Sequence, residues 1–203
     1  MVSTMLYSII LLAGFLPAVQ TQGSAASSAQ QSAITIHVFK SGLFSGFAHN
    51  HIVVAPIAQA TVDPARMTAD ITVATKDMKV TDPEVSEKDR TEIQTTMLGP
   101  TVLDAAKFSE IRFKSSRIEQ TTPQHYRVMG MLDLHGASKE IVLEVTGGPE
   151  HYHGATKLKQ TDFGIKPISM GGGSIKVKDE LQLEFDVYSA APAKMGAANP
   201  SNR

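Results

Sequence analysis

Residues 126–134 read YRVMGMLDL, and this stretch decides the fold that we predict. Two sets of residues alternate along it: Tyr126, Val128, Gly130, Leu132 and Leu134 in one set, and Arg127, Met129, Met131 and Asp133 in the other. A period of two is typical of an antiparallel strand with one buried face and one solvated face. The segment Gly136-Ala137-Ser138-Lys139 follows directly, and its small and polar residues predict a hairpin turn.

The same alternation recurs on both sides of this stretch. It occurs at residues 34–38, 67–75, 111–114, 141–145 and 181–187. Seven or eight strands with little helix make an all-β domain, which is either a sandwich or a barrel. A barrel of about eight strands can enclose a small ligand.

One segment has helical spacing instead. Asp82 is a candidate N-cap, Pro83 fits the first helical position, and Gly99-Pro100 is a stop signal. We therefore predict one helix at about 83–98. A short irregular or helical stretch is expected after it, over residues 102–108.

The first charged residue of the 203 is Lys40, and a signal peptide explains part of this charge-free start. Residues 5–19 are apolar, which is short for a membrane span of about 20 residues, and small residues follow them. We expect a signal peptide over 1–26, a linker over 27–32, one domain over 33–189 and a disordered tail over 190–203. The mature protein would then be periplasmic or extracellular, without stable insertion into a membrane.

Composition excludes several classes of protein. The chain has no Cys, which removes disulfide scaffolds, thiol nucleophiles and cysteine-based metal sites. Its formal net charge of −1 gives no reason to expect nucleic-acid binding. No serine-hydrolase motif of the G-x-S-x-G type is present.

Two His-x-His pairs are the main candidates for metal chemistry. His49 and His51 form one pair, and His151 and His153 form the other. Side chains two residues apart on a strand point the same way, and imidazole suits Zn, Cu or Ni. A periplasmic metal-binding or redox-associated protein is therefore an alternative function. Ordinary hydrogen bonding at a barrel rim explains the same residues without a metal.

Asp89, Arg90 and Glu92 are charged residues on the predicted helix. They fit a polar gate over a cavity. They equally fit an exposed helix face with local ion pairs, each of which contributes about 0.3–0.5 kcal/mol.

Several segments, taken in order, resemble the YceI-like family of lipid- or polyisoprenoid-binding proteins of bacterial envelopes. Lys107-Phe108-Ser109 stands where that family has a Lys-Tyr-Pro turn, and 111–115 matches its Ile-x-Phe-x-Ser strand. Residues 130–139 resemble its Gly-x-Leu-x-Leu-x-Gly-x-Thr-Lys hairpin, and Asp162-Phe163-Gly164-Ile165 its Asp-Phe-Gly-Ile segment. The chain departs from the family in having no Trp and in lacking the usual Asp and His of the helix motif.

The resemblance implies an antiparallel, lipocalin-like barrel that holds an isoprenoid, quinone or other long-chain lipid in an apolar tunnel. We expect a binding protein for storage or transport, with no catalytic residue and no cofactor. The expected tunnel or mouth residues are Phe44, Phe47, Phe108, Phe113, Met131 and Phe163, with His49 and His51 facing a head group. The sequence leaves a homodimer open, and it leaves open a binding module with a solid interior and no small ligand.

Overall fold

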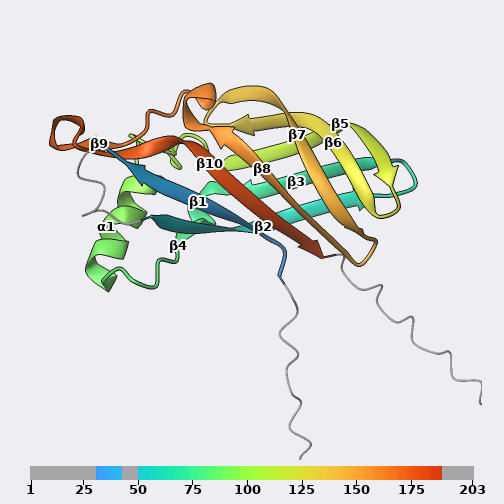
Figure 1. Cartoon of the computed structure of the whole chain (residues 1–203), viewed down its shortest axis with the longest axis horizontal. Helices are drawn as coiled ribbons and strands as arrows, with labels where there is room; N and C mark the ends of the chain where they lie inside the picture. Colours follow the sequence, from blue (N-terminus) through green and yellow to red (C-terminus); the bar gives the residue numbers. More distant parts are fainter. Residues whose placement is uncertain (1–30, 43–49, 189–203) are drawn as a thin grey trace, which may run out of the picture.

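Eight antiparallel strands close into a barrel around an apolar interior (Figure 1). The structure is a computed structural model that describes residues 31–42 and 50–188. The barrel strands are β1 (Ala33–Ser41), β2 (His51–Asp63), β3 (Thr68–Ala74), β5 (Glu110–Thr122), β6 (His125–Leu134), β7 (Ala137–Gly148), β8 (His151–Lys159) and β10 (Ile175–Tyr188). This architecture confirms the predicted all-β barrel.

Shorter elements complete the described part of the chain. They are the strands β4 (Lys79–Val80) and β9 (Ser169–Met170), the helix α1 (Glu87–Leu98), and the 3-10 helices η2 (Thr75–Asp77), η3 (Gln160–Phe163) and η4 (Gly171–Gly173). Strand β4 pairs with β2, and β9 pairs with β10. Helix α1 lies at one end of the long axis, and the β2–β3 and β5–β6 turns lie at the other (Figure 1).

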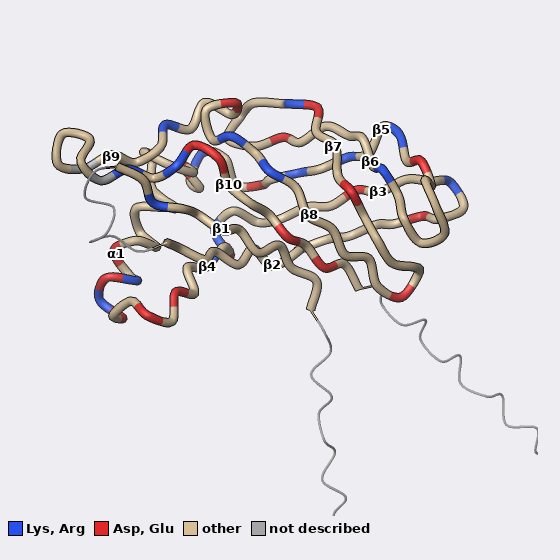
Figure 2. The backbone as a smooth tube through the Cα atoms, in the orientation of Figure 1, with Lys and Arg blue, Asp and Glu red and all other residues tan. Residues whose placement is uncertain are grey.

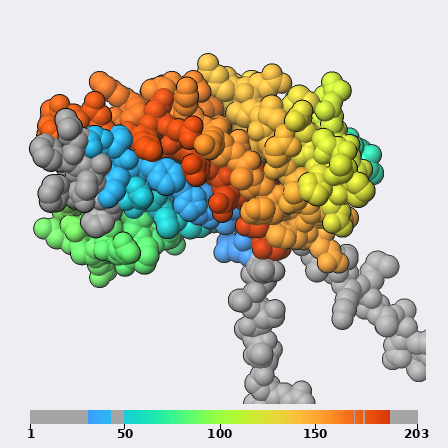
Figure 3. Space-filling model, in the orientation of Figure 1, coloured from blue at the N-terminus to red at the C-terminus, as the bar shows by residue number. Residues whose placement is uncertain are grey.

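Strand β1 closes the barrel because it pairs with both β10 and β2. Ile36 lies opposite Leu183 on β10 and opposite Val53 on β2. Partners directly opposite each other share a face, so apolar residues of three strands point inward together. Figure 3 shows β1, β10 and β8 side by side in one continuous outer wall.

The alternation along β6 separates a buried face from an exposed one. Val128 and Leu132 are buried, whereas Arg127 is exposed. At Gly130 a Cβ atom would come within 2.6 Å of the Phe113 ring. Glycine therefore stands on the inner face of β6 because the Phe113 ring already fills that space.

The hairpin after β6 turns at His135 and Gly136, so only the first residue of the predicted turn belongs to it, and residues 137–139 lie in β7. His135 and Gly136 both have positive φ, 52° and 77°. Leu134 pairs with Ala137 across this two-residue loop. Two positive φ values define the type I′ turn, whose twist matches that of the flanking strands.

Strands β2 and β8 are not among the strands that the alternation predicts. In strand β2 four successive apolar residues at 52–55 follow His51, and Pro56 comes next, so its period is masked. Strand β8 has Gly154 on its inner face, where a Cβ would lie 2.3 Å from the Phe185 ring. Neither pattern is a strong strand signal in the sequence alone.

Helix α1 begins four residues later than predicted. Its N-cap is Ser86, whose Oγ accepts a hydrogen bond from the Asp89 N–H at 3.2 Å and donates one to Asp89 Oδ2 at 2.8 Å. Asp82, the predicted cap, is buried and hydrogen-bonded to β2 instead. Residues 102–108 contain turns and no helix.

Charged residues of both signs are mixed over the outer surface, for example along β10 and α1 (Figure 2). Arg127 and Glu144 form one cross-strand pair at 3.0 Å, and Lys157 and Glu180 form another at 3.1 Å. Exposed pairs of this kind contribute about 0–1 kcal/mol each. The barrel therefore depends chiefly on its apolar interior.

The predicted signal peptide (1–26) and tail (190–203) lie outside the described residues, as do residues 27–30 of the linker. In the described ranges, no helix is long and apolar enough to cross a membrane.

Candidate ligand-binding interior

Within the described residues the barrel interior contains two cavities, and the larger lies beside α1. Its volume is about 480 Å³, inside the usual range of small-molecule sites, about 300–1,000 Å³. Most of its wall is aliphatic and comes from β1, β2, β10 and α1: Ile36, Val38, Val53, Ala55, Ile93, Met97, Val177 and Leu181. The charged and imidazole groups of its border are Lys40, His51, Asp89, Glu92 and Lys176.

The smaller cavity lies toward the β2–β3 turn and has a volume of about 250 Å³. Its apolar wall includes Ile57, Ile71, Phe113, Ile118, Val128, Ile141, Leu143, Phe185 and Val187. Asp63 and Thr68 belong to its border at the turn, together with Gln120. Both ends of the interior are thus more polar than its middle.

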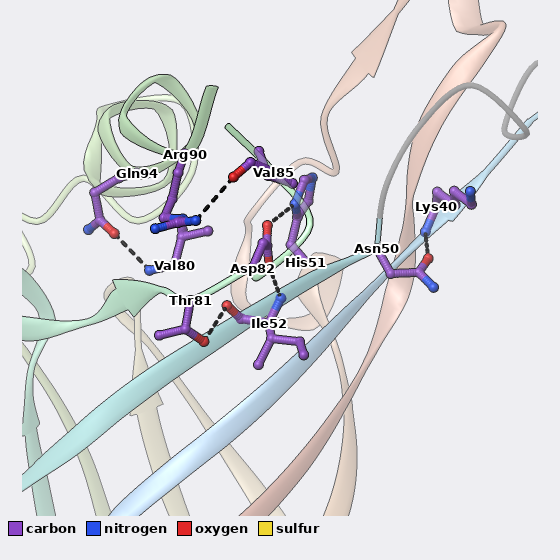
Figure 4. Close-up of polar contacts among 10 residues, drawn as sticks. All are labelled: Lys40, Asn50, His51, Ile52, Val80, Thr81, Asp82, Val85, Arg90 and Gln94. Carbon is purple, nitrogen blue, oxygen red and sulfur yellow. Dashed lines mark hydrogen bonds and ion pairs between the residues drawn. The ribbon is translucent and has the colours of Figure 1, made fainter. Parts of the chain in front are cut away.

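Gln94 holds α1 over the larger cavity (Figure 4). Its Oε1 accepts a hydrogen bond from the Val80 N–H, and its Nε2 donates to the Met78 carbonyl, both at 2.8 Å. The amide thereby pairs a backbone N–H of β4 and the carbonyl of the residue before this strand. Ile93 and Met97 of the same helix then line the cavity.

Asp89, Arg90 and Glu92 of α1 divide between two roles. Asp89 and Glu92 belong to the border of the larger cavity, as a polar gate requires. Arg90 donates from Nη2 to the Val85 carbonyl at 3.0 Å and is not in the cavity wall (Figure 4). Its role is to attach α1 to the segment before it.

Asp82 fixes the orientation of His51 (Figure 4). Asp82 is 3% exposed, and its carboxylate accepts hydrogen bonds from His51 Nδ1 at 2.7 Å and from the Ile52 N–H. A carboxylate only accepts, so Nδ1 carries the hydrogen and Nε2 is left for another partner. Since His51 lines the larger cavity, its imidazole is a wall group that can hydrogen-bond a ligand.

The second His-x-His pair lies on the outer face of the barrel. Tyr152 lines the interior, so its neighbours His151 and His153 point outward. Asp186 Oδ1 lies 2.7 Å from His151 Nε2 and 3.2 Å from His153 Nδ1. The His151 ring also stacks on Tyr188, with 4.3 Å between ring centroids.

His51 lies far from the second His-x-His pair, so a metal site that joins His51 to His151 and His153 is wrong. His51 lies opposite Val38 of β1, whereas Asp186 lies opposite Ala33. Five residues of strand separate these positions, which is about 17 Å. His49 lies outside the described residues, and the described ones contain no group of three or more His, Asp or Glu suited to a metal ion.

Asp186→Asn should remove a contribution to the stability of the fold that is present near neutral pH and lost in acid. Partial burial raises the pKa of Asp186, but hydrogen bonds from His151 and His153 outweigh it and lower the pKa below 3.8. A carboxyl with a lowered pKa stabilises the fold above its ordinary pKa and loses that effect as the pH falls through the folded value. Urea unfolding at a series of pH values measures the free energy of unfolding of both proteins. Near neutrality Asp186→Asn should be less stable than the native protein by under about 1 kcal/mol, because Asp186 is 41% exposed. The difference should vanish below the folded pKa, and a difference that persists in acid would contradict this role of Asp186.

Only some of the residues that we expected to contact a ligand line a cavity. Phe113 lines the smaller cavity and His51 the larger. Phe163 and Phe108 line neither: Phe163 is buried at 2% exposure, and Phe108 packs on His135 with 4.6 Å between ring centroids. Three of the expected residues, Phe44, Phe47 and His49, lie outside the described residues.

Met131 was expected in the tunnel, and the structure corrects this placement. Met131 is 41% exposed and lines neither cavity. Its neighbours Gly130 and Leu132 are buried, so alternation along β6 turns Met131 to the outer face. It is not carried into the proposed contacts.

The sequence prediction missed the aliphatic wall. The alternating residues of β1 and β10 line the cavities, although aromatic residues were expected to do so. The signal was present in the alternation itself, because the inward face of each strand is also the face toward the ligand. Asp82 was missed as the partner of His51 because 31 residues separate the two.

Comparison with known proteins agrees with this geometry. A profile of the YceI-like domain matches residues 24–188. A UPF0312 protein of Vibrio cholerae is 30% identical over 132 residues, which are 60% of this chain. The match spans 66% of that protein, slightly less than two thirds of its length.

Two solved structures have the same fold. BcnA of Burkholderia cenocepacia superposes with a TM-score of 0.60 at 18% identity, over 78% of this chain and 96% of that one. A YceI protein of Campylobacter jejuni superposes with a TM-score of 0.50 at 18% identity, over 70% of this chain and 82% of that one. With its closed barrel, its apolar interior and the profile match over most of its length, this chain belongs to the YceI-like family.

Proposed function

We propose that this protein binds a long-chain amphiphile, such as an isoprenoid or a quinone, inside the barrel and stores or transports it. The observation that carries the proposal is the pair of interior cavities with almost wholly apolar walls. Burying one CH₂ group contributes about 0.8 kcal/mol, so a long chain needs few polar contacts to bind. The proposal assigns no catalytic residue.

The polar end of the ligand is proposed to lie beside α1. His51, Lys176 and Glu92 border the larger cavity there and offer both donors and acceptors. The apolar chain would extend from them toward the middle of the barrel. Pockets of this type use a few polar groups for orientation and apolar area for affinity.

We also propose that the protein is exported to the periplasm or beyond the cell. The support is the apolar stretch at 5–19, followed by the small residues Ser24-Ala25-Ala26.

Ala55→Phe should block ligand binding by filling the larger cavity. Ala55 is 2% exposed and lines that cavity, so a phenyl ring at this position would occupy space proposed for the ligand. We expect the native protein to bind the apolar dye phenylnaphthylamine saturably and to release it to hexadecanol. The Ala55→Phe protein should bind the dye at least about tenfold more weakly, a loss of about 1.4 kcal/mol. Fluorescence titration measures both effects.

Ala155→Phe is the matched control, because Ala155 is exposed on β8. It should bind the dye as the native protein does. If Ala55→Phe and Ala155→Phe bind the dye with equal affinity, the dye binds outside the cavity and the proposal is contradicted. Circular dichroism should show that Ala55→Phe keeps the strand content of the native barrel.

A further inference from the structure

The two cavities share four wall residues. Ile34 of β1, Leu132 of β6, Leu158 of β8 and Leu183 of β10 line both. We call these four side chains the waist. Leu132 and Leu158 are buried at 8% and 9% exposure.

Strand positions show that the cavities lie end to end with the waist between them. On β10, Leu181 lines only the larger cavity, Leu183 lines both, and Phe185 lines only the smaller. Strand β8 has the same order, with Gln160 after its end, Leu158 at the waist and Thr156 beyond it. The interior is therefore one lumen that is divided once.

The division is made by side chains alone. All four waist residues are aliphatic, so no hydrogen bond or charge holds the waist closed. Leucine and isoleucine change rotamers without breaking polar contacts, and a passing alkyl chain would meet only steric resistance. The backbone pairing of β10 with β8 continues across this level without a break, with Leu181 opposite Leu158 and Leu183 opposite Thr156.

We propose that the waist limits the length of the apolar chain that the barrel accepts, an inference that rests on the proposed function. A chain whose polar end stays beside α1 fills the 480 Å³ cavity first and then meets the waist. The 250 Å³ cavity beyond lies below the usual size of a ligand site and becomes useful only as an extension of the larger one. Longer chains must displace the waist side chains to reach it.

A series of straight-chain alcohols tests this inference by displacement of phenylnaphthylamine. From octanol through dodecanol and hexadecanol to eicosanol, affinity for the native protein should rise about fourfold per added CH₂ while the larger cavity fills. It should level off once the chain reaches the waist. In Leu183→Ala the waist is wider, so the affinity should keep rising to a longer alcohol before it levels off.

Leu143→Ala is the matched control, because Leu143 lines only the smaller cavity and its truncation leaves the waist intact. Its affinity should level off at the native chain length. Leu158→Ala widens the waist from a second strand and should reproduce the Leu183→Ala result; it also replaces that variant if Leu183→Ala does not fold.

The outcomes separate the two proposals. If alcohols bind but level off at one chain length in the native protein, in Leu143→Ala and in the waist variants, the waist does not limit length and only this inference is overturned. If no alcohol displaces the dye from any of these proteins, the proposed function fails and the inference fails with it.

Discussion

Phe163→Ala should lower the free energy of unfolding by about 3–5 kcal/mol, the usual cost of deleting a buried phenyl ring. Phe163 is 2% exposed and ends η3, which packs against β7, β8 and β10. Its carbonyl also lies 3.2 Å from His135 Nδ1. Truncation would leave a void where three strands and η3 meet, and the β-strands around it cannot collapse to fill it. Urea unfolding followed by circular dichroism measures the change.

Phe108→Ala is the comparison, because both phenylalanines were expected to contact ligand and Phe108 is only half-buried. Its truncation should cost clearly less than that of Phe163. Neither substitution should change dye affinity much, since neither ring lines a cavity. A Phe163→Ala protein with native stability and weakened dye binding would contradict its placement as a packing residue.

Asp82→Ala should destabilise the fold by about 2–4 kcal/mol, because it leaves two donors near the helix end of the barrel without their acceptor. The Ile52 N–H and the His51 Nδ1–H both donate to this carboxylate, which is 3% exposed. Hydrogen bonds to a charged acceptor contribute about 1.5–3 kcal/mol each, partly offset here by release of a buried charge. The measurement is again the free energy of unfolding in urea.

Two further variants give this prediction a graded control. Asp82→Asn keeps one carbonyl oxygen for the Ile52 N–H and should lose less stability than Asp82→Ala. Asp162→Ala removes an exposed carboxylate and should change stability by less than about 0.5 kcal/mol. Equal losses for Asp82→Ala and Asp162→Ala would show that the buried hydrogen bonds contribute nothing.

The fold could be predicted because the strongest strands show their period in the sequence. Residues 126–134 and 181–187 alternate apolar and polar side chains, and a barrel is one of few ways to bury so many half-apolar strands. Strand β2 could not be found this way, because 52–55 are apolar on both faces. The start of α1 was misplaced because Asp82 and Ser86 are both good N-caps, and only tertiary contact with His51 decides between them.

The candidate site was harder to predict than the fold for a physical reason. Phe163 is 2% exposed and fills the space where it stands. Most of the wall of the cavities is Ile, Val, Leu and Ala, and Phe113 and Phe185 belong to the wall of the smaller one. Met131 was misplaced because both alternating sets of β6 contain apolar side chains, and sequence alone does not say which set faces inward. The waist could not be foreseen at all, because it joins four strands far apart in the sequence.

Organic extraction of the purified protein, followed by mass spectrometry, tests the central claim most directly. The account predicts that a long-chain lipid is released from the native protein in an amount close to one per chain. It predicts that the Ala55→Phe protein, purified in parallel, releases much less. A native protein that releases no lipid, and takes up none when incubated with long-chain amphiphiles, would contradict the account.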